Sequence, residues 1–160
     1  MDDKKPKSPC ESLVESRYLV MPQHANQYGT AFGGTIVAWM DIVGSMAAQK
    51  HCGKEVVTAS IDSLSFEEPI YIGDQVVIKA FVSHVGRSSM EVSVTVYRHS
   101  PTTDRERQAT KAFLTFVALG KDKKPTPVAA LLLKTDEEKR QYEISQKRAE
   151  DRKRRLKQGR

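Results

Sequence analysis

Apolar and polar residues alternate over four stretches after residue 56, a pattern typical of strands with one buried face. The alternation that begins at Val57 slips in phase after Ile61, where Leu64 and Phe66 take over the apolar positions. This slip predicts a β-bulge. A further strand is expected nearer the N-terminus, ended by Pro22. The expected strands cover residues 16–21, 57–62, 76–82, 90–96 and 107–119.

A helical pattern lies between the first and the second of these strands and runs over residues 32–48. Val37, Trp39 and other apolar residues extend its hydrophobic surface, so we expect this helix to be buried on nearly all sides. Residues 51–54 are expected to break it. The residues of its most regular apolar face, at spacings of four, three and four, are Ile36, Met40, Val43 and Ala47.

One long buried helix followed by a meander of long strands predicts an α+β fold, in which an antiparallel sheet wraps around the helix. The terminal strands of an open sheet leave backbone groups unpaired, and symmetric association removes such an edge. We therefore expect a dimer in which two sheets join edge to edge.

The last part of the chain is basic. Residues 134–160 carry +5 of the formal net charge of +6, so the remainder is nearly neutral, which argues against a body built to bind nucleic acid. Thr135 and Glu138 form a capping box that opens a helix. Because this helix has almost no apolar stripe, a solvated helix is expected. We divide the chain into a loose leader (1–9), one domain (10–124) and a basic helical tail (125–160).

Composition limits the expected cellular location of the protein and the kinds of metal or cofactor site that it could contain. The N-terminus is charged and no apolar run reaches the length of a membrane span, so a cytoplasmic location is expected. Cys10 and Cys52 lack the spacing of a metal site, and no histidine stands with a carboxylate or cysteine at such a spacing. We expect no metal, no nucleotide cofactor and histidines at the surface.

Asp41 is the one charged residue between Gln27 and Gln49, set among apolar residues of the expected helix. Burial of a carboxylate without a partner is costly, and such placement is one way to prepare a general base or nucleophile. Hydrogen bonds from a loop or a second chain are the structural alternative. Gly33 and Gly34 stand at the start of the same helix, where free backbone amides can hold a developing oxyanion.

These residues belong to a longer pattern that resembles the acyl-CoA thioesterases of the hotdog superfamily. The resemblance implies hydrolysis of acyl-CoA to a carboxylic acid and CoA, in dimers or trimers of dimers, with CoA entering only as part of substrate and product. It covers about residues 17–118. The matching runs are MPQHAN at 21–26, FGG at 32–34, WMD at 39–41, VTASID at 57–62, FEEPI at 66–70, GD at 73–74 and GRSSMEV at 86–92.

The resemblance also implies roles for individual residues. Asp41 would act as base or nucleophile, and Asn26 of the other subunit would place water or the thioester. The Gly34 amide, beside Gly33, would bind the thioester oxygen, and Thr58 would line the site. Contacts to the nucleotide part of CoA would come from Arg87, Ser88 and Ser89.

One departure concerns Phe32, where many hotdog thioesterases have His, so the oxyanion contact would rest on backbone alone. Two other functions stay open. A hotdog dehydratase would use a histidine near the helix, which residues 32–48 do not contain. A non-catalytic acyl-CoA-sensing module would act through its basic tail.

Overall fold

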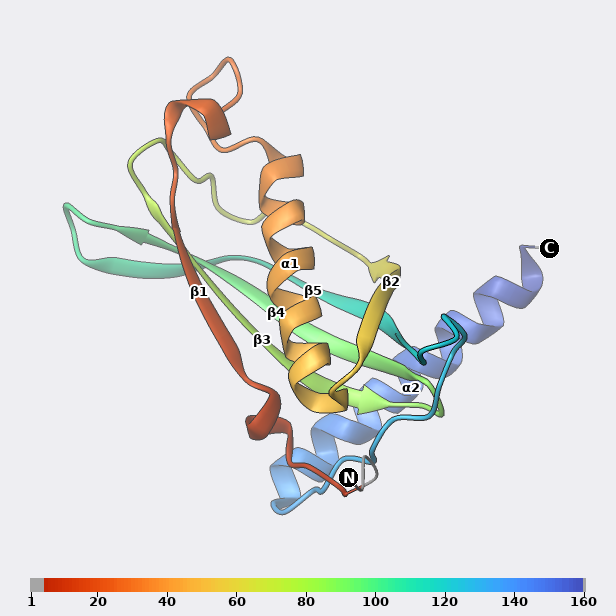
Figure 1. Ribbon diagram of the computed structural model, residues 1–160. Coiled ribbons are helices and arrows are strands. Elements are labelled where there is room, and N and C mark those ends of the chain that lie inside the picture. The colour runs from red at the N-terminus through yellow and green to blue at the C-terminus, as the bar shows by residue number, and fades with distance from the viewer. Residues whose placement is uncertain (1–4, 160) are drawn as a thin grey trace.

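The computed structural model describes residues 5–159 and contains one antiparallel sheet with a helix on each face (Figure 1). The sheet order is β1-β3-β4-β5-β2, so β1 and β2 form its edges. This arrangement confirms the expected α+β fold. The elements are η1 (Pro9–Ser12), β1 (Val14–Leu19), η2 (Pro22–His24), α1 (Gly33–Cys52), β2 (Glu55–Asp62), β3 (Gln75–Val85), β4 (Ser89–Ser100), β5 (Arg105–Leu119) and α2 (Asp136–Gln158).

The helix α1 lies across one face of the sheet, and its apolar side forms the core with the inward residues of the strands. At Gly44 a Cβ atom would come within 3.2 Å of the Phe116 ring, so a glycine allows this close approach. The predicted break at residues 51–54 is placed too early. His51 and Cys52 are buried within the helix, which ends at Gly53 in the left-handed conformation.

The sheet covers only one side of α1, so the expectation that this helix is buried on nearly all sides is wrong within one chain. Ile42 is 50% exposed and Met46 36% exposed. The neighbouring edge strand β2 also presents apolar side chains, with Val57 46% and Ile61 41% exposed. An apolar surface of this extent on one side of a molecule is typical of an interface with another chain.

The predicted β-bulge exists, but at another position. The register of β2 against β5 shifts between Thr58 and Ser60, and β2 ends at Asp62. Leu64 and Phe66 therefore lie beyond the strand, and Ser63 has a φ of 31°. The slip of the apolar phase after Ile61 reflects the end of the strand.

The helix α2 packs on the other face of the sheet, and the expectation of a solvated helix is wrong (Figure 1). Ser145 and Ala149 of this helix are buried. The capping box at Thr135 is confirmed, since Glu138 N donates to Thr135 Oγ1 at 3.1 Å and Thr135 N donates to Glu138 Oε2 at 3.1 Å.

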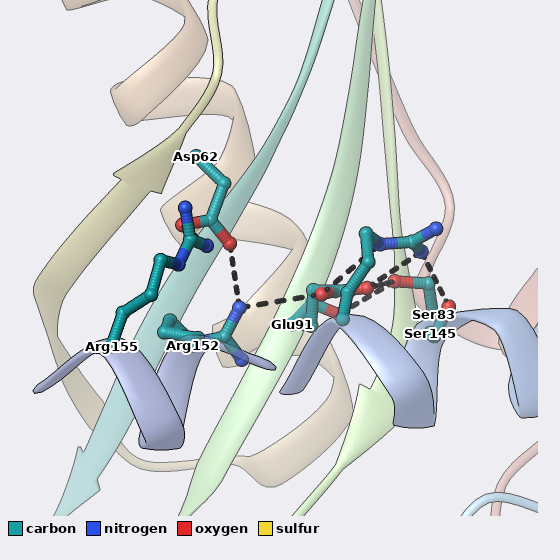
Figure 2. Close-up of polar contacts among 7 residues, drawn as sticks. Asp62, Ser83, Glu91, Ser145, Arg152 and Arg155 are labelled. Carbon is teal, nitrogen blue, oxygen red and sulfur yellow. Dashed lines mark hydrogen bonds and ion pairs between the residues drawn. The ribbon is translucent and has the colours of Figure 1, made fainter. Parts of the chain in front are cut away.

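A buried ion-pair network fixes α2 on the sheet (Figure 2). The Glu91 side chain on β4 has no exposed surface, and it accepts from Arg148 Nη2 at 2.9 Å. Arg152 Nη1 lies 2.6 Å from Asp62 Oδ2 at the end of β2 and 3.5 Å from Glu91 Oε2. Arg155 approaches the same aspartate at 3.8 Å. The hydrophobic pattern of the sequence did not predict that α2 packs on the sheet, because the side chains that make this contact are charged.

The described part of the expected leader is attached to the domain, while residues 1–4 of it lie outside the described residues. Lys7 pairs with Leu131 in a parallel β-bridge. Its Nζ also donates to the His51 carbonyl at 2.8 Å. These contacts hold the leader around Lys7 against Leu131 and against the C-terminal end of α1.

Candidate active site

Asp41 lies on the side of α1 that faces β2, and Thr58 Oγ1 donates a hydrogen bond to its Oδ1 at 2.6 Å. The carboxylate is half-buried within one chain, and Thr58 is exposed. A short hydrogen bond to a charged acceptor is stronger than a neutral one and fixes the rotamer of the carboxylate. The second oxygen of Asp41 stays available for chemistry.

The N-terminus of α1 presents free backbone amides. The first backbone bonds into the helix run from Thr35 and Ile36 to the Phe32 carbonyl, at 3.0 and 3.3 Å. Gly33 and Gly34 donate no hydrogen bond within the described residues. A cavity of about 200 Å³ opens beside Gly33. Such amides, at the positive end of the helix dipole, are suited to an oxyanion.

Asn26 belongs to the loop that leads into this end of α1. Its Oδ1 accepts from Tyr28 N at 2.9 Å, and its Nδ2 donates to Thr30 Oγ1 at 2.8 Å. The loop is tied to the helix start, because Phe32 N donates to the His24 carbonyl at 2.8 Å. Asn26 and Gly34 are thus at the same end of α1.

An aromatic cluster holds the same loop against the helix. The indole of Trp39 stacks on Tyr18 of β1, with ring centroids 4.4 Å apart and an interplanar angle of 5°. His24 contacts the same indole edge-on, with ring centroids 5.0 Å apart. His24 was expected only to lie at the surface, but its ring also packs against Trp39.

Arg87, Ser88 and Ser89 lie at the turn between β3 and β4. The Arg87 and Ser88 carbonyls accept from Val128 and Ala118 at 3.0 and 2.9 Å, so the turn backbone is anchored. The Arg87 side chain is exposed and forms no ion pair within the described residues. Ser89 pairs with Val117 of β5, which pairs with Val57 of β2, so the turn lies two strands, about 10 Å, from the residue before Thr58.

The structure thus places Asp41 beside Thr58, and it places Asn26 at the same end of α1 as Gly33 and Gly34. The two groups are separate within one chain, because Gly34 and Asp41 are seven residues, about 10 Å, apart along α1. One reacting carbonyl group therefore cannot contact the Gly34 amide and the Asp41 carboxylate of the same chain. Sequence reasoning identified each candidate but not this separation, which depends on helix geometry.

Other candidate groups show little sign of chemistry. Cys52 is buried, and burial raises the pKa of its thiol, which disfavours a nucleophilic thiolate. The described residues contain no cluster of three or more histidine, cysteine or acidic side chains able to hold a metal. His51 is 1% exposed, so the expectation that all histidines are at the surface is wrong there. No helix within residues 5–159 is long and apolar enough to cross a membrane.

The thioesterase superfamily model matches residues 28–104. An uncharacterized acyl-CoA thioester hydrolase of Bacillus subtilis is 42% identical over 146 residues, covering 91% of this chain and 84% of that protein. Acyl-coenzyme A thioesterase 11 of Mus musculus is 40% identical over 82% of this chain, which spans only 22% of the mouse protein.

Solved structures show the same similarity. A hexameric acyl-CoA thioesterase is 39% identical with a TM-score of 0.90, covering 95% of this chain and 97% of that one. An acyl-CoA hydrolase of Staphylococcus aureus, solved with butyryl coenzyme A and coenzyme A, is 39% identical with a TM-score of 0.88, covering 96% and 93%. Alanine variants of that enzyme at one asparagine, one aspartate and one threonine have also been solved.

The fold is therefore the hotdog fold. The chain belongs to the thioesterase superfamily, among its acyl-CoA thioester hydrolases.

Proposed function

We propose that this protein hydrolyses acyl-CoA thioesters to a carboxylic acid and CoA, with Asp41 as general base or nucleophile. The observation that carries the proposal is the 2.6 Å hydrogen bond that orients Asp41 on the open side of α1. CoA would enter as part of the substrate, and no separate cofactor is needed for this chemistry. A cytoplasmic location stays a prediction from the sequence.

The spacing of the candidate residues supports their assignment. The asparagine, aspartate and threonine replaced in the Staphylococcus aureus hydrolase are 15 and 17 positions apart in that chain. Asn26, Asp41 and Thr58 have the same two separations here. Three residue types at two matching intervals in a chain of 38–39% identity favour the same set of residues in the present site.

Geometry favours a site built between two copies of the chain. Because Gly34 and Asp41 are about 10 Å apart on one helix, a thioester bound at the Gly34 amide would meet Asp41 of a second, antiparallel α1. The midpoint between these residues is close to Ala38, a small exposed residue that permits close contact of two helices. The exposed Ile42, Met46 and Val57 would then be covered.

Asp41 would act in one of two ways. As a general base, its free carboxylate oxygen takes a proton from water, and the water oxygen attacks the thioester carbonyl carbon. As a nucleophile, the same oxygen attacks directly and forms a mixed anhydride that water then hydrolyses. In both cases the Gly34 amide would stabilise the oxyanion, the carbon–sulfur bond breaks and CoA leaves as a thiolate that takes up a proton.

Recognition of the nucleotide part of CoA would fall to the turn between β3 and β4. Arg87 offers a guanidinium that forms no ion pair among residues 5–159, and Ser88 and Ser89 offer hydroxyls. A guanidinium binds phosphate oxygens through two parallel hydrogen bonds. The anchored backbone of this turn keeps these donors in place.

The test is release of CoA thiol from short, medium and long acyl-CoAs by the wild type and by Asp41→Asn. We expect the variant to keep its fold and to lose at least about 100-fold in kcat, because a general base contributes about 10² to 10⁴ in rate. Asp122→Asn, in an exposed turn, is the control and should keep full turnover.

Unchanged turnover in Asp41→Asn would sink the residue assignment. Tight binding of acyl-CoA by the wild type without turnover would instead support the sensing module. In that module the basic tail would have to act, yet Arg148, Arg152 and Arg155 are turned toward the sheet. Single turnover in ¹⁸O water tests the anhydride route: label in the Asp41 carboxylate identifies an anhydride that water opens at the aspartyl carbonyl. Label in the product acid alone fits either general-base hydrolysis or water attack on the acyl carbonyl of the anhydride.

A further inference from the structure

A second cavity lies on the sheet face opposite Asp41, under the first turns of α2. Its volume is about 390 Å³, within the usual range for small-molecule sites. The floor consists of Phe81 on β3 and Phe113 on β5, and Tyr142 of α2 lines it from the other side. Leu13 and Leu133 complete its apolar wall.

Ser93 is a polar residue in the floor of this cavity. It lies between the two phenylalanines, since Phe81 pairs with Ser93 and Ser93 pairs with Phe113 across the strands. The residue is 2% exposed and lines the cavity. Its hydroxyl has no hydrogen-bond partner within the part of the chain that the structure describes. The hydroxyl opens into the cavity, where it can donate to a group that enters.

Lys111 stands at the rim, diagonally across from Ser93 on the same sheet face. It is exposed, and its Nζ lies 5.3 Å from the centroid of the Phe113 ring. Among residues 5–159 no carboxylate forms an ion pair with it. A rim cation and a hydroxyl of the floor therefore line the same cavity.

The remaining charged groups around the cavity already have partners. Arg148 donates to Glu91 at 2.9 Å and to Ser145 at 2.7 Å. Glu138 closes the capping box of α2, and Glu137 accepts from Gln141 at 2.8 Å. The charge that would complete this site is therefore negative.

We propose that this cavity binds an amphipathic monocarboxylate. One carboxylate oxygen would accept from the Ser93 hydroxyl and the other from the Lys111 ammonium. The hydrocarbon body would lie on Phe81, against Leu13 and Leu133. An adjoining cavity of about 550 Å³ shares Lys111, Phe113 and Arg148 with this one, so the groove continues toward the end of α2 for a longer ligand.

Titration calorimetry with decanoate tests this site independently of turnover. We expect one decanoate per chain in the wild type and in Asp41→Asn, and weaker binding of decanol, which keeps the tail but lacks the charge. Lys111→Glu should weaken decanoate binding about fivefold or more, since it replaces an attraction by a repulsion at a partly screened site. Lys121→Glu, an exposed lysine in the turn after β5, is the matched control.

Ser93→Ala is the second variant and should weaken decanoate binding while leaving decanol binding nearly unchanged. Lys111 is exposed, so its variant keeps the fold even if a change at Ser93 does not. The proposal fails if decanoate shows no saturable binding up to about 1 mM. It fails equally if Lys111→Glu binds decanoate as the wild type does, or if only Asp41→Asn changes the affinity, which would place the ligand at α1.

Discussion

His51 is a buried imidazole that keeps only one hydrogen bond. Its Nε2 lies 2.9 Å from the Ala129 carbonyl, and its Nδ1 has no partner within the described residues. Burial lowers the pKa of His51 from its ordinary value of 6.5, and the cation of Lys7 acts in the same direction. The neutral form is therefore the one that fits the fold.

A fall in stability below neutral pH follows from this residue. Because the pKa is lower in the folded state, the contribution of His51 to the unfolding free energy is complete above pH 6.5 and is lost as the pH falls toward the lowered pKa. Chemical unfolding between pH 7 and 5 should show a shallower loss in His51→Gln than in the wild type. His84, whose pKa burial also lowers, keeps part of the slope, and His99→Gln is the control.

An equal slope of unfolding free energy against pH in the wild type and in His51→Gln would contradict this account.

Among single residues, Asp41 was predictable from sequence because a lone charge interrupts an apolar helix. Its bond from Thr58 was not, since 17 residues and a long-range strand pairing separate the two. His51 was missed because a histidine at a helix end looks exposed until Ala129 and Lys7 are seen to cover it.

At the scale of elements, alternation located every strand of the described residues and helical spacing located α1, because each of these buries an apolar face. The helix α2 was located by its capping box at Thr135 instead. The ends were less predictable. α1 extends to Cys52 because its last turn is buried, and the bulge lies at Thr58 because pairing with β5 decides it. The docking of α2 was missed because its partner Glu91 occupies an outward position of β4, which by pattern alone faces solvent.

The α2 network yields a stability prediction. Replacing Arg148 and Arg152 together by methionine leaves the fully buried Glu91 without a cation, and should lower the unfolding free energy by about 3 kcal/mol. Adding Glu91→Met should restore most of that loss, because the uncompensated charge is then gone. Urea unfolding of the double and triple variants measures both steps.

Arg140→Met, which removes an exposed ion pair with Glu137 on the same helix, is the control and should leave the unfolding free energy unchanged within error. A triple variant no more stable than the double variant would show that the arginines act through packing and not by neutralising Glu91.

For the whole molecule, a site shared between two chains has a clear consequence. Asn26→Ala and Asp41→Asn should each abolish most activity, but a mixed dimer of the two places both changes in one site and none in the other. Purified mixed dimers, isolated with two different tags, should therefore regain about half of the wild-type rate. Continued inactivity of the mixed dimer would show that both residues act within one chain.

Pairing of two chains was expected from the sheet edge, but the antiparallel arrangement of two α1 helices that we propose was not. Sequence alone does not say that Gly34 and Asp41 are too far apart for one chain to use both, since this follows from the rise of α1. The exposed Ile42 and Val57 belong to the apolar surface that we propose contacts a second chain. A hydrophobic pattern in the sequence cannot distinguish such a surface from the core of the domain. The domain boundaries at residues 9 and 124 stay a prediction.

The stack of Trp39 on Tyr18 gives the protein an optical reporter of its own. Trp39 is the single tryptophan of the chain, two residues before Asp41, and His24 of the loop that carries Asn26 touches its ring. Any shift of that loop against α1 changes the surroundings of the only indole. A movement of the loop on substrate binding would therefore be visible in the intrinsic fluorescence in real time, without a label and without a chromogenic product.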